Sequence, residues 1–180
     1  MRLLIAFVLF TLLPLTVDGR RADDFSLSIS LTRGERSRDS HSQTTRITLK
    51  GEEIVYEKSY SGFRGGARSV PVKKSFKLKA EDIESLKKLV RENELLTSDS
   101  LLVAGAEGGV RRYFEIALAI NLDGKRSAVE IKGPRSAASI KEQKIYQRAY
   151  ALMEAVYKLL SERDKEIGYE NRDLINDAMP

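Results

Sequence analysis

Residues 112–132 read RYFEIALAINLDGKRSAVEIK and hold the clearest structural pattern in the chain. Apolar residues occupy every second position of the first half: Phe114, Ile116, Leu118, Ile120 and Leu122. A period of two places these side chains on one face of a β-strand. Asp123-Gly124 is a turn sequence that joins antiparallel strands, and Arg126–Ile131 forms the return strand. The segment therefore predicts a hairpin with one apolar face, which a second layer must cover.

Four more strands are expected upstream, because the same alternation occurs near residues 25–32, 45–49, 54–60 and 70–78. The polar stretch Arg33–Gln43 contains no apolar residue, so we expect a solvated loop there. Gly51 can adopt the positive φ of a tight turn between the second and third strands. Four consecutive strands with short connections predict an antiparallel meander.

Two helices are predicted. The period changes at Glu81, after which apolar residues recur at helical spacing as far as Val90. Ser139 and Glu142 match a capping box, and the helix that follows should run to about Arg163. Between the helices, Leu101–Val103 is consistent with either a short strand or a buried loop.

The resulting fold class is α+β, with the order four strands, helix, two strands, helix. About six strands would form one antiparallel sheet with both helices packed on one face. The other face would meet solvent or a partner, and it would carry Ser26, Ser28, Ser30, Arg46, Thr48 and Glu115. We expect a single domain over residues 24–163, followed by a polar, loosely ordered tail over residues 164–180.

Residues 1–19 are typical of a cleaved secretory signal. One Arg precedes the apolar run Leu3–Leu15, which is shorter than the roughly 20 residues that span a bilayer. Cleavage after Gly19 would give a secreted or periplasmic protein with no transmembrane span in the mature chain. Arg20 and Arg21 keep an uncleaved anchor open as the alternative, because positive charge there resists translocation. The chain has no cysteine and no glycosylation sequon, which favours a bacterial exported protein.

The composition excludes several kinds of chemistry. The 180 residues include no cysteine and one histidine, so disulfides, iron–sulfur clusters and multi-histidine metal centres are excluded within one chain. Asp39, Ser40 and His41 are neighbours in a polar stretch, where a hydrolase triad cannot be held in place. No nucleotide-binding or hydrolase motif occurs. We therefore assign no catalytic, cofactor-binding or metal-binding residue, and expect no cofactor.

A basic segment is the candidate binding site. Residues 58–79 contain seven cations and no acid, around a glycine cluster at positions 62, 65 and 66. Backbone N–H groups and cations can hold a phosphate, a sulfated glycan or a lipid head group. A hairpin connection whose lysines keep a strand edge soluble is the structural alternative. The candidate ligand-binding residues are Tyr60, Phe63, Arg64, Arg68, Lys73 and Lys74.

Residues 45–57 (TRITLKGEEIVYE), a glycine-containing link, a basic strand and residues 80–90 (AEDIESLKKLV) follow one another in the chain. This arrangement resembles small exported bacterial domains of unknown function, and the resemblance covers residues 24–96. It implies a strand pair around a glycine-containing turn and a helix that packs back on the strands. Such families have no established catalytic residues, so the resemblance assigns no roles.

The leading hypothesis is a non-catalytic exported domain that binds an anionic envelope component or a protein. No nucleic-acid partner is expected, because one short basic tract and a net charge of +5 are weak signals for one. No segment indicates an oligomeric state. Two alternatives are a hydrolase or transferase that uses Glu107 or Glu115, and a protease-inhibitor-like module that inserts residues 62–66 into a partner cleft.

Overall fold

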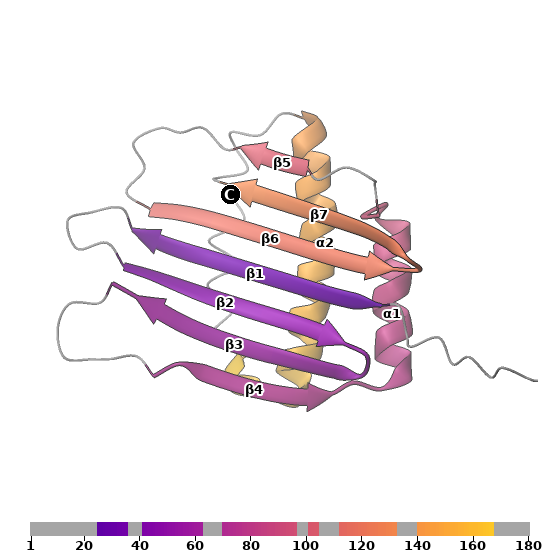
Figure 1. The fold of residues 1–180 in the computed structure, drawn as a ribbon, viewed down its shortest axis with the longest axis horizontal. Coiled ribbons are helices and arrows are strands. Elements are labelled where there is room, and N and C mark those ends of the chain that lie inside the picture. The colour runs from indigo at the N-terminus through magenta and orange to yellow at the C-terminus, as the bar shows by residue number, and fades with distance from the viewer. Residues whose placement is uncertain are drawn as a thin grey trace, which may run out of the picture.

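The computed structural model describes residues 25–35, 41–62, 70–96, 101–104, 112–132 and 140–167. Figure 1 shows a sheet with two helices behind it. The elements follow one another as β1 (Ser26–Glu35), β2 (His41–Lys50), β3 (Glu53–Ser61), β4 (Val72–Lys77), α1 (Ala80–Glu92), β5 (Leu101–Ala104), β6 (Arg112–Leu122), β7 (Lys125–Lys132) and α2 (Ile140–Arg163).

Within these ranges one sheet is formed, in the order β4-β3-β2-β1-β6-β7-β5. Six strands are antiparallel to their neighbours, which confirms the α+β class and the antiparallel sheet. The predicted strand order is wrong in one respect, because Leu101–Ala104 adds a seventh strand that runs parallel to β7. Four residues are too few to show a period, so the sequence could not distinguish this strand from a loop.

The predicted loop Arg33–Gln43 is wrong at both ends. β1 continues to Glu35 and β2 begins at His41, with Gly34 opposite Ser42. Polar cross-strand contacts replace the apolar alternation here, since Arg33 Nη2 donates to Gln43 Oε1 at 3.3 Å. Pairs of this kind stabilise an antiparallel ladder without burying apolar surface. His41, expected in a loop, is therefore a strand residue.

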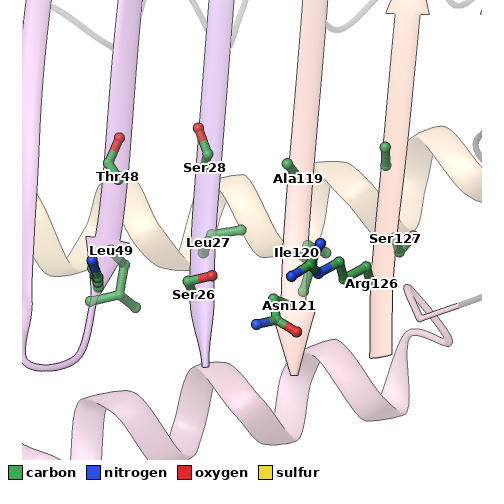
Figure 2. A pocket seen from close by; sticks show the side chains of 12 residues that line it. Ser26, Leu27, Ser28, Thr48, Leu49, Ala119, Ile120, Asn121, Arg126 and Ser127 are labelled. Atoms are coloured by element: carbon green, nitrogen blue, oxygen red, sulfur yellow. The ribbon is translucent and has the colours of Figure 1, made fainter. Parts of the chain in front are cut away.

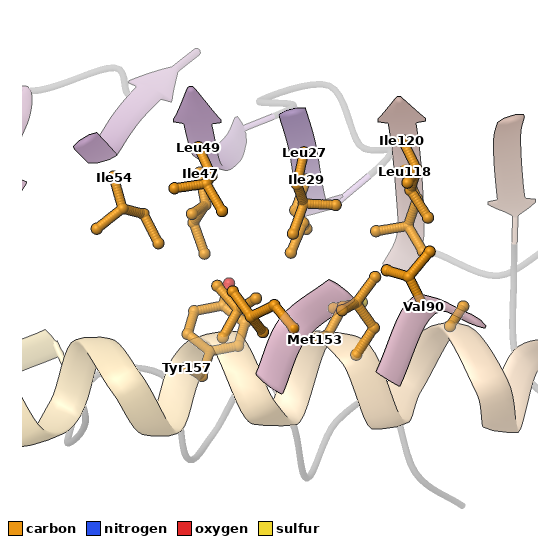
Figure 3. Packing of buried hydrophobic residues seen from close by; sticks show 14 of the residues in the cluster. Leu27, Ile29, Ile47, Leu49, Ile54, Val90, Leu118, Ile120, Met153 and Tyr157 are labelled. Carbon is orange, nitrogen blue, oxygen red and sulfur yellow. The ribbon is translucent and has the colours of Figure 1, made fainter. Parts of the chain in front are cut away.

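The core lies between the sheet and the helices. In Figures 1 and 3, α1 and α2 lie on the same side of the sheet, and α2 crosses behind the strands. Alternate strand residues such as Leu27 and Ile29 point toward Val90 of α1 and Met153 and Tyr157 of α2 in Figure 3. All of these are at most 4% exposed. The strand residues between them lie on the opposite face, which no described helix or strand covers and which is termed the open face. No described helix is both long and apolar enough to cross a membrane.

Both short hairpin turns use backbone with positive φ. Gly51 has a φ of 60°, while Asp123 and Gly124 have φ values of 54° and 74°. The pairing of Leu122 with Lys125 confirms the predicted two-residue turn at Asp123-Gly124. Positive φ at both positions matches a type I′ turn, whose twist suits antiparallel strands.

The C-terminal end of α2 is tied to two other elements. Lys74 of β4 donates to Asp164 and Glu166, and Arg163 donates to Asp82 of α1. Ile167 is only 2% exposed. The first four residues of the predicted tail are thus held against the domain, and residues 168–180 lie outside the described part.

Candidate functional site

Of the predicted basic residues, the structure describes Lys73 and Lys74 and places them on opposite faces of the sheet. Phe63, Arg64 and Arg68 lie outside the described residues. Lys73 and Lys74 are consecutive in β4, so their side chains leave the sheet on opposite faces. Lys73 lies on the open face opposite Glu57, whereas Lys74 lies on the helix face opposite Tyr56.

Both lysines are already paired with acids. Lys73 Nζ lies 2.8 Å from Glu57, and Lys74 Nζ lies 2.6 Å from Asp164 and 2.9 Å from Glu166. The hydrogen bond with Lys74 lowers the pKa of Asp164, and the acids in turn raise the pKa of Lys74. Lys74 therefore joins β4 to the end of α2, which is a structural role.

Tyr60 lies at the end of β3 and also has a neighbour of its own. Lys58 Nζ lies 5.2 Å from the centre of the Tyr60 ring, which is the geometry of a cation–π contact. Lys58 and Tyr60 follow the buried Tyr56 at every second position of β3. They therefore lie on the helix face of the sheet, whereas Lys73 lies on the opposite face.

A different group of residues forms a shallow depression on the open face, with a volume of about 510 Å³. Figure 2 shows it across β2, β1, β6 and β7. The strand register places Lys50, Ser26, Asn121 and Arg126 side by side in one line across the sheet, named here the Lys50–Arg126 row. The next line along the strands consists of Thr48, Ser28, Ala119 and Ala128.

Neither cation of the row forms an ion pair with a described residue. The acids nearest to them in sequence have other partners. Asp123 pairs with Arg91 at 2.8 Å, and Glu52 pairs with Lys77 at 2.8 Å. Glu53 is opposite Lys50 in the register; it accepts a hydrogen bond from Ser75 but keeps its charge, so it offsets part of the charge of Lys50. No acidic side chain lines the depression. Lys50 and Arg126 are exposed and form no ion pair with another described residue, so the depression carries net positive charge.

Unpaired polar groups lie between the cations. Among the described residues, no side-chain hydrogen bond involves Ser26, Ser28 or Thr48. The Oδ1 atom of Asn121 is shielded from solvent and has no hydrogen-bond partner within the described ranges. A buried acceptor without a partner costs about 1–3 kcal/mol, so a turn of the Asn121 amide that brings this atom to a donor in the depression is favoured. The depression thus offers two cations, three hydroxyls and an amide.

The other residues considered from the sequence do not form a reactive site. His41 is opposite Glu35 in the register, and Glu115 is opposite Thr32 and Lys132. Glu107 lies outside the described residues. Within the described ranges, no group of three or more His, Cys, Asp or Glu residues is placed to hold a metal ion.

Sequence reasoning placed Ser26, Ser28 and Thr48 on the open face, and the structure has them there. It missed Lys50, Asn121 and Arg126. These three residues are far apart in the chain, and only the register between strands aligns them. One feature of the sequence could have indicated the site: all three residues lie beside the two hairpin turns. Residues that flank the turns of two hairpins in one sheet can lie at the same end of that sheet.

The fold and this site define an α+β domain in which one sheet face, covered by no described element, carries a positively charged depression. No protein-family model matches the chain, and no curated protein matches it either.

Proposed function

We propose that this protein is an exported, non-catalytic binding domain, and that its open sheet face contacts an anionic component of the cell envelope. The observation that carries the proposal is the pair Lys50 and Arg126, which flank one depression that no acidic side chain lines. The proposal moves the binding site from the basic segment around residues 58–79 to the depression across β2, β1, β6 and β7.

The expected affinity follows from the charges. A hydrogen bond to a charged group contributes about 1.5–3 kcal/mol, and association has its own entropy cost. Two such contacts therefore support only weak binding of a single anionic group. A ligand with repeated anionic groups binds more tightly, because each further contact is intramolecular. A polymeric or surface-bound anion is the favoured class.

Retention on immobilised dextran sulfate at low salt tests the binding site. We expect a Lys50→Gln, Arg126→Gln double variant to elute at clearly lower salt than the wild type. Lys125→Gln is a matched control, because Lys125 is adjacent to Arg126 but alternates with it along β7 and lies outside the depression. Equal elution of the double variant and the wild type would contradict the proposed site. Loss of retention in an Arg64→Ser, Arg68→Ser variant alone would return the site to the basic segment.

The proposed export rests on residues 1–19, with their short apolar run and the small residue Gly19. When the full chain is expressed in a bacterium, N-terminal sequencing of the periplasmic fraction should give a mature protein that starts at Arg20. Recovery of the intact N-terminus from the cytoplasm would contradict export. Recovery of the intact N-terminus in the membrane fraction would favour the anchor.

A further inference from the structure

We infer that the depression at the Lys50–Arg126 row binds an acidic saccharide, that is, a sugar bearing carboxylate or sulfate groups. This inference rests on the proposed function and names the class of anion. It draws on three properties of the lining residues, namely cations at both ends, unpaired hydrogen-bonding groups between them, and two exposed methyl groups beside them.

The cations are spaced for an extended ligand. Lys50 and Arg126 are three strand spacings apart, which is about 14 Å between their Cα atoms. Arg126 presents a planar fork that can hold a carboxylate or sulfate with two hydrogen bonds, and Lys50 presents a point charge. Two anionic groups of one oligosaccharide can therefore engage both ends of the row together.

Asn121 favours an anion that also carries hydroxyl groups over an anion without them. Its Oδ1 atom is an acceptor without a partner among the described residues. An ionised carboxylate or sulfate carries only acceptors, so it cannot satisfy this atom. The terminal torsion of an asparagine is broad, so the amide can turn toward the depression at low cost. A sugar hydroxyl can then donate to Oδ1, while Ser26, Ser28 and Thr48 accept from or donate to other hydroxyls.

The remaining surface suits a sugar ring. Ala119 and Ala128 are adjacent in the register and exposed. Their methyl groups form a flat apolar surface beside the hydroxyls, against which the C–H face of a ring can pack. A lipid acyl chain needs an apolar groove instead, and the side chains on this side of the strands are two serines, one threonine, one asparagine and two alanines between two cations (Figure 2).

Calorimetric titration of residues 20–180 at low salt tests the ligand class. The probes are trigalacturonic acid, its fully methylated ester, a heparin-derived tetrasaccharide and triglutamate. We expect trigalacturonic acid or the tetrasaccharide to bind at least fivefold more tightly than triglutamate, which has carboxylates but no hydroxyls. The neutral ester should bind at least tenfold more weakly than trigalacturonic acid. Phosphatidylglycerol vesicles are the fifth probe, and preferential binding to them would overturn the saccharide in favour of a lipid surface.

Variants separate this inference from the proposed function. Asn121→Ala should weaken acidic-saccharide binding about fivefold and leave triglutamate binding unchanged. Lys50→Gln and Arg126→Gln should weaken both ligands, and Lys125→Gln neither. Thermal melts establish that each variant is folded. If triglutamate binds as tightly as the saccharides and Asn121→Ala has no effect, the saccharide inference fails while anion binding stands. If no anionic probe binds, both fail.

Discussion

Lys74 shows how one residue can have a structural role that its sequence context hides. It belongs to a run of cations that resembles a binding surface, but it donates to Asp164 and Glu166 at the end of α2. Its side chain is 26% exposed, and that of Asp164 is 22% exposed. The contact joins the edge strand β4 to a segment 90 residues further along the chain.

Replacement of Lys74 should reduce the change in the free energy of unfolding between pH 7 and pH 3. The pKa of Asp164 is lowered by Lys74, so the folded state favours the ionised carboxyl. The resulting stabilisation is present at pH values above the ordinary carboxyl pKa and is lost as the pH falls below it. We expect Lys74→Met to lower the free energy of unfolding in urea at pH 7, with a smaller difference from wild type at pH 3.

The matched control is Lys73→Met. Lys73 and Glu57 are more exposed, at 70% and 38%, so solvent screens their interaction more strongly and the effect at pH 7 should be smaller. A larger effect from Lys73→Met than from Lys74→Met would contradict this assignment of roles.

Tyr157 carries a buried hydroxyl. The residue is 4% exposed, and within the described part of the chain its hydroxyl has no hydrogen-bond partner. Burial raises the pKa of the phenol, and the nearby Tyr56 adds to the effect. The neutral form is therefore strongly favoured in the folded state.

Tyr157→Phe should leave the free energy of unfolding at pH 7 unchanged or increase it by up to about 1 kcal/mol, because it removes an unsatisfied buried group. Wild-type stability is complete below the ordinary tyrosine pKa of about 10 and declines as the pH rises above that value. The Phe variant should lose less stability between pH 9 and pH 11 in urea titrations. A loss above 1 kcal/mol at pH 7 would instead reveal a hydrogen-bond partner for the hydroxyl.

At the scale of elements, the β6–β7 hairpin depends on its turn. Gly124 has a φ of 74°, and a Cβ added there would meet nothing within 4 Å. The cost of Gly124→Ala is therefore backbone strain alone, about 1 kcal/mol in the free energy of unfolding. Gly124→Asn should cost less, since asparagine tolerates positive φ better. Urea unfolding of the two variants checks the order, and an equal or larger loss for Asn would contradict it.

Element by element, the sequence was informative where apolar residues alternate. The strands that contain Ile29, Ile47 and Leu118 were predicted because one face of each is buried. The end of β1 and the start of β2 were not predicted, because their residues are polar and show no apolar period. The strand β5 was not predicted either, because four residues are too few to show a period. The site was missed for a related reason. Lys50 and Arg126 come into one line across the sheet only through β1 and β6, and periodicity within one strand gives no register with another.

At the scale of the whole molecule, the net charge of +5 is small, and ion pairs at Lys73, Lys77 and Arg91 locally compensate several of the cations. The open depression is an exception. Binding of an anionic ligand should therefore respond to salt through Lys50 and Arg126 more than through the overall charge.

The affinity for trigalacturonic acid should fall at least fivefold between 20 and 300 mM NaCl, because the screening length shortens from about 20 Å to below 6 Å. The Lys50→Gln, Arg126→Gln variant should show a clearly shallower slope of affinity against salt. A slope equal to that of the wild type would mean that other cations hold the ligand.

The central place of β1 also has a consequence for how the chain folds. β1 is synthesised first among the strands, yet its second neighbour is β6, so Ser26 cannot pair with Asn121 until most of the chain has been made. Contacts between residues so distant in sequence form slowly. Until β6 has been synthesised, one edge of β1 has no partner strand, and the meander of β1–β4 cannot complete its core. Such a delay is compatible with the export proposed above, in which the chain would cross a membrane unfolded. It also makes the interval before closure the period when a chaperone matters most.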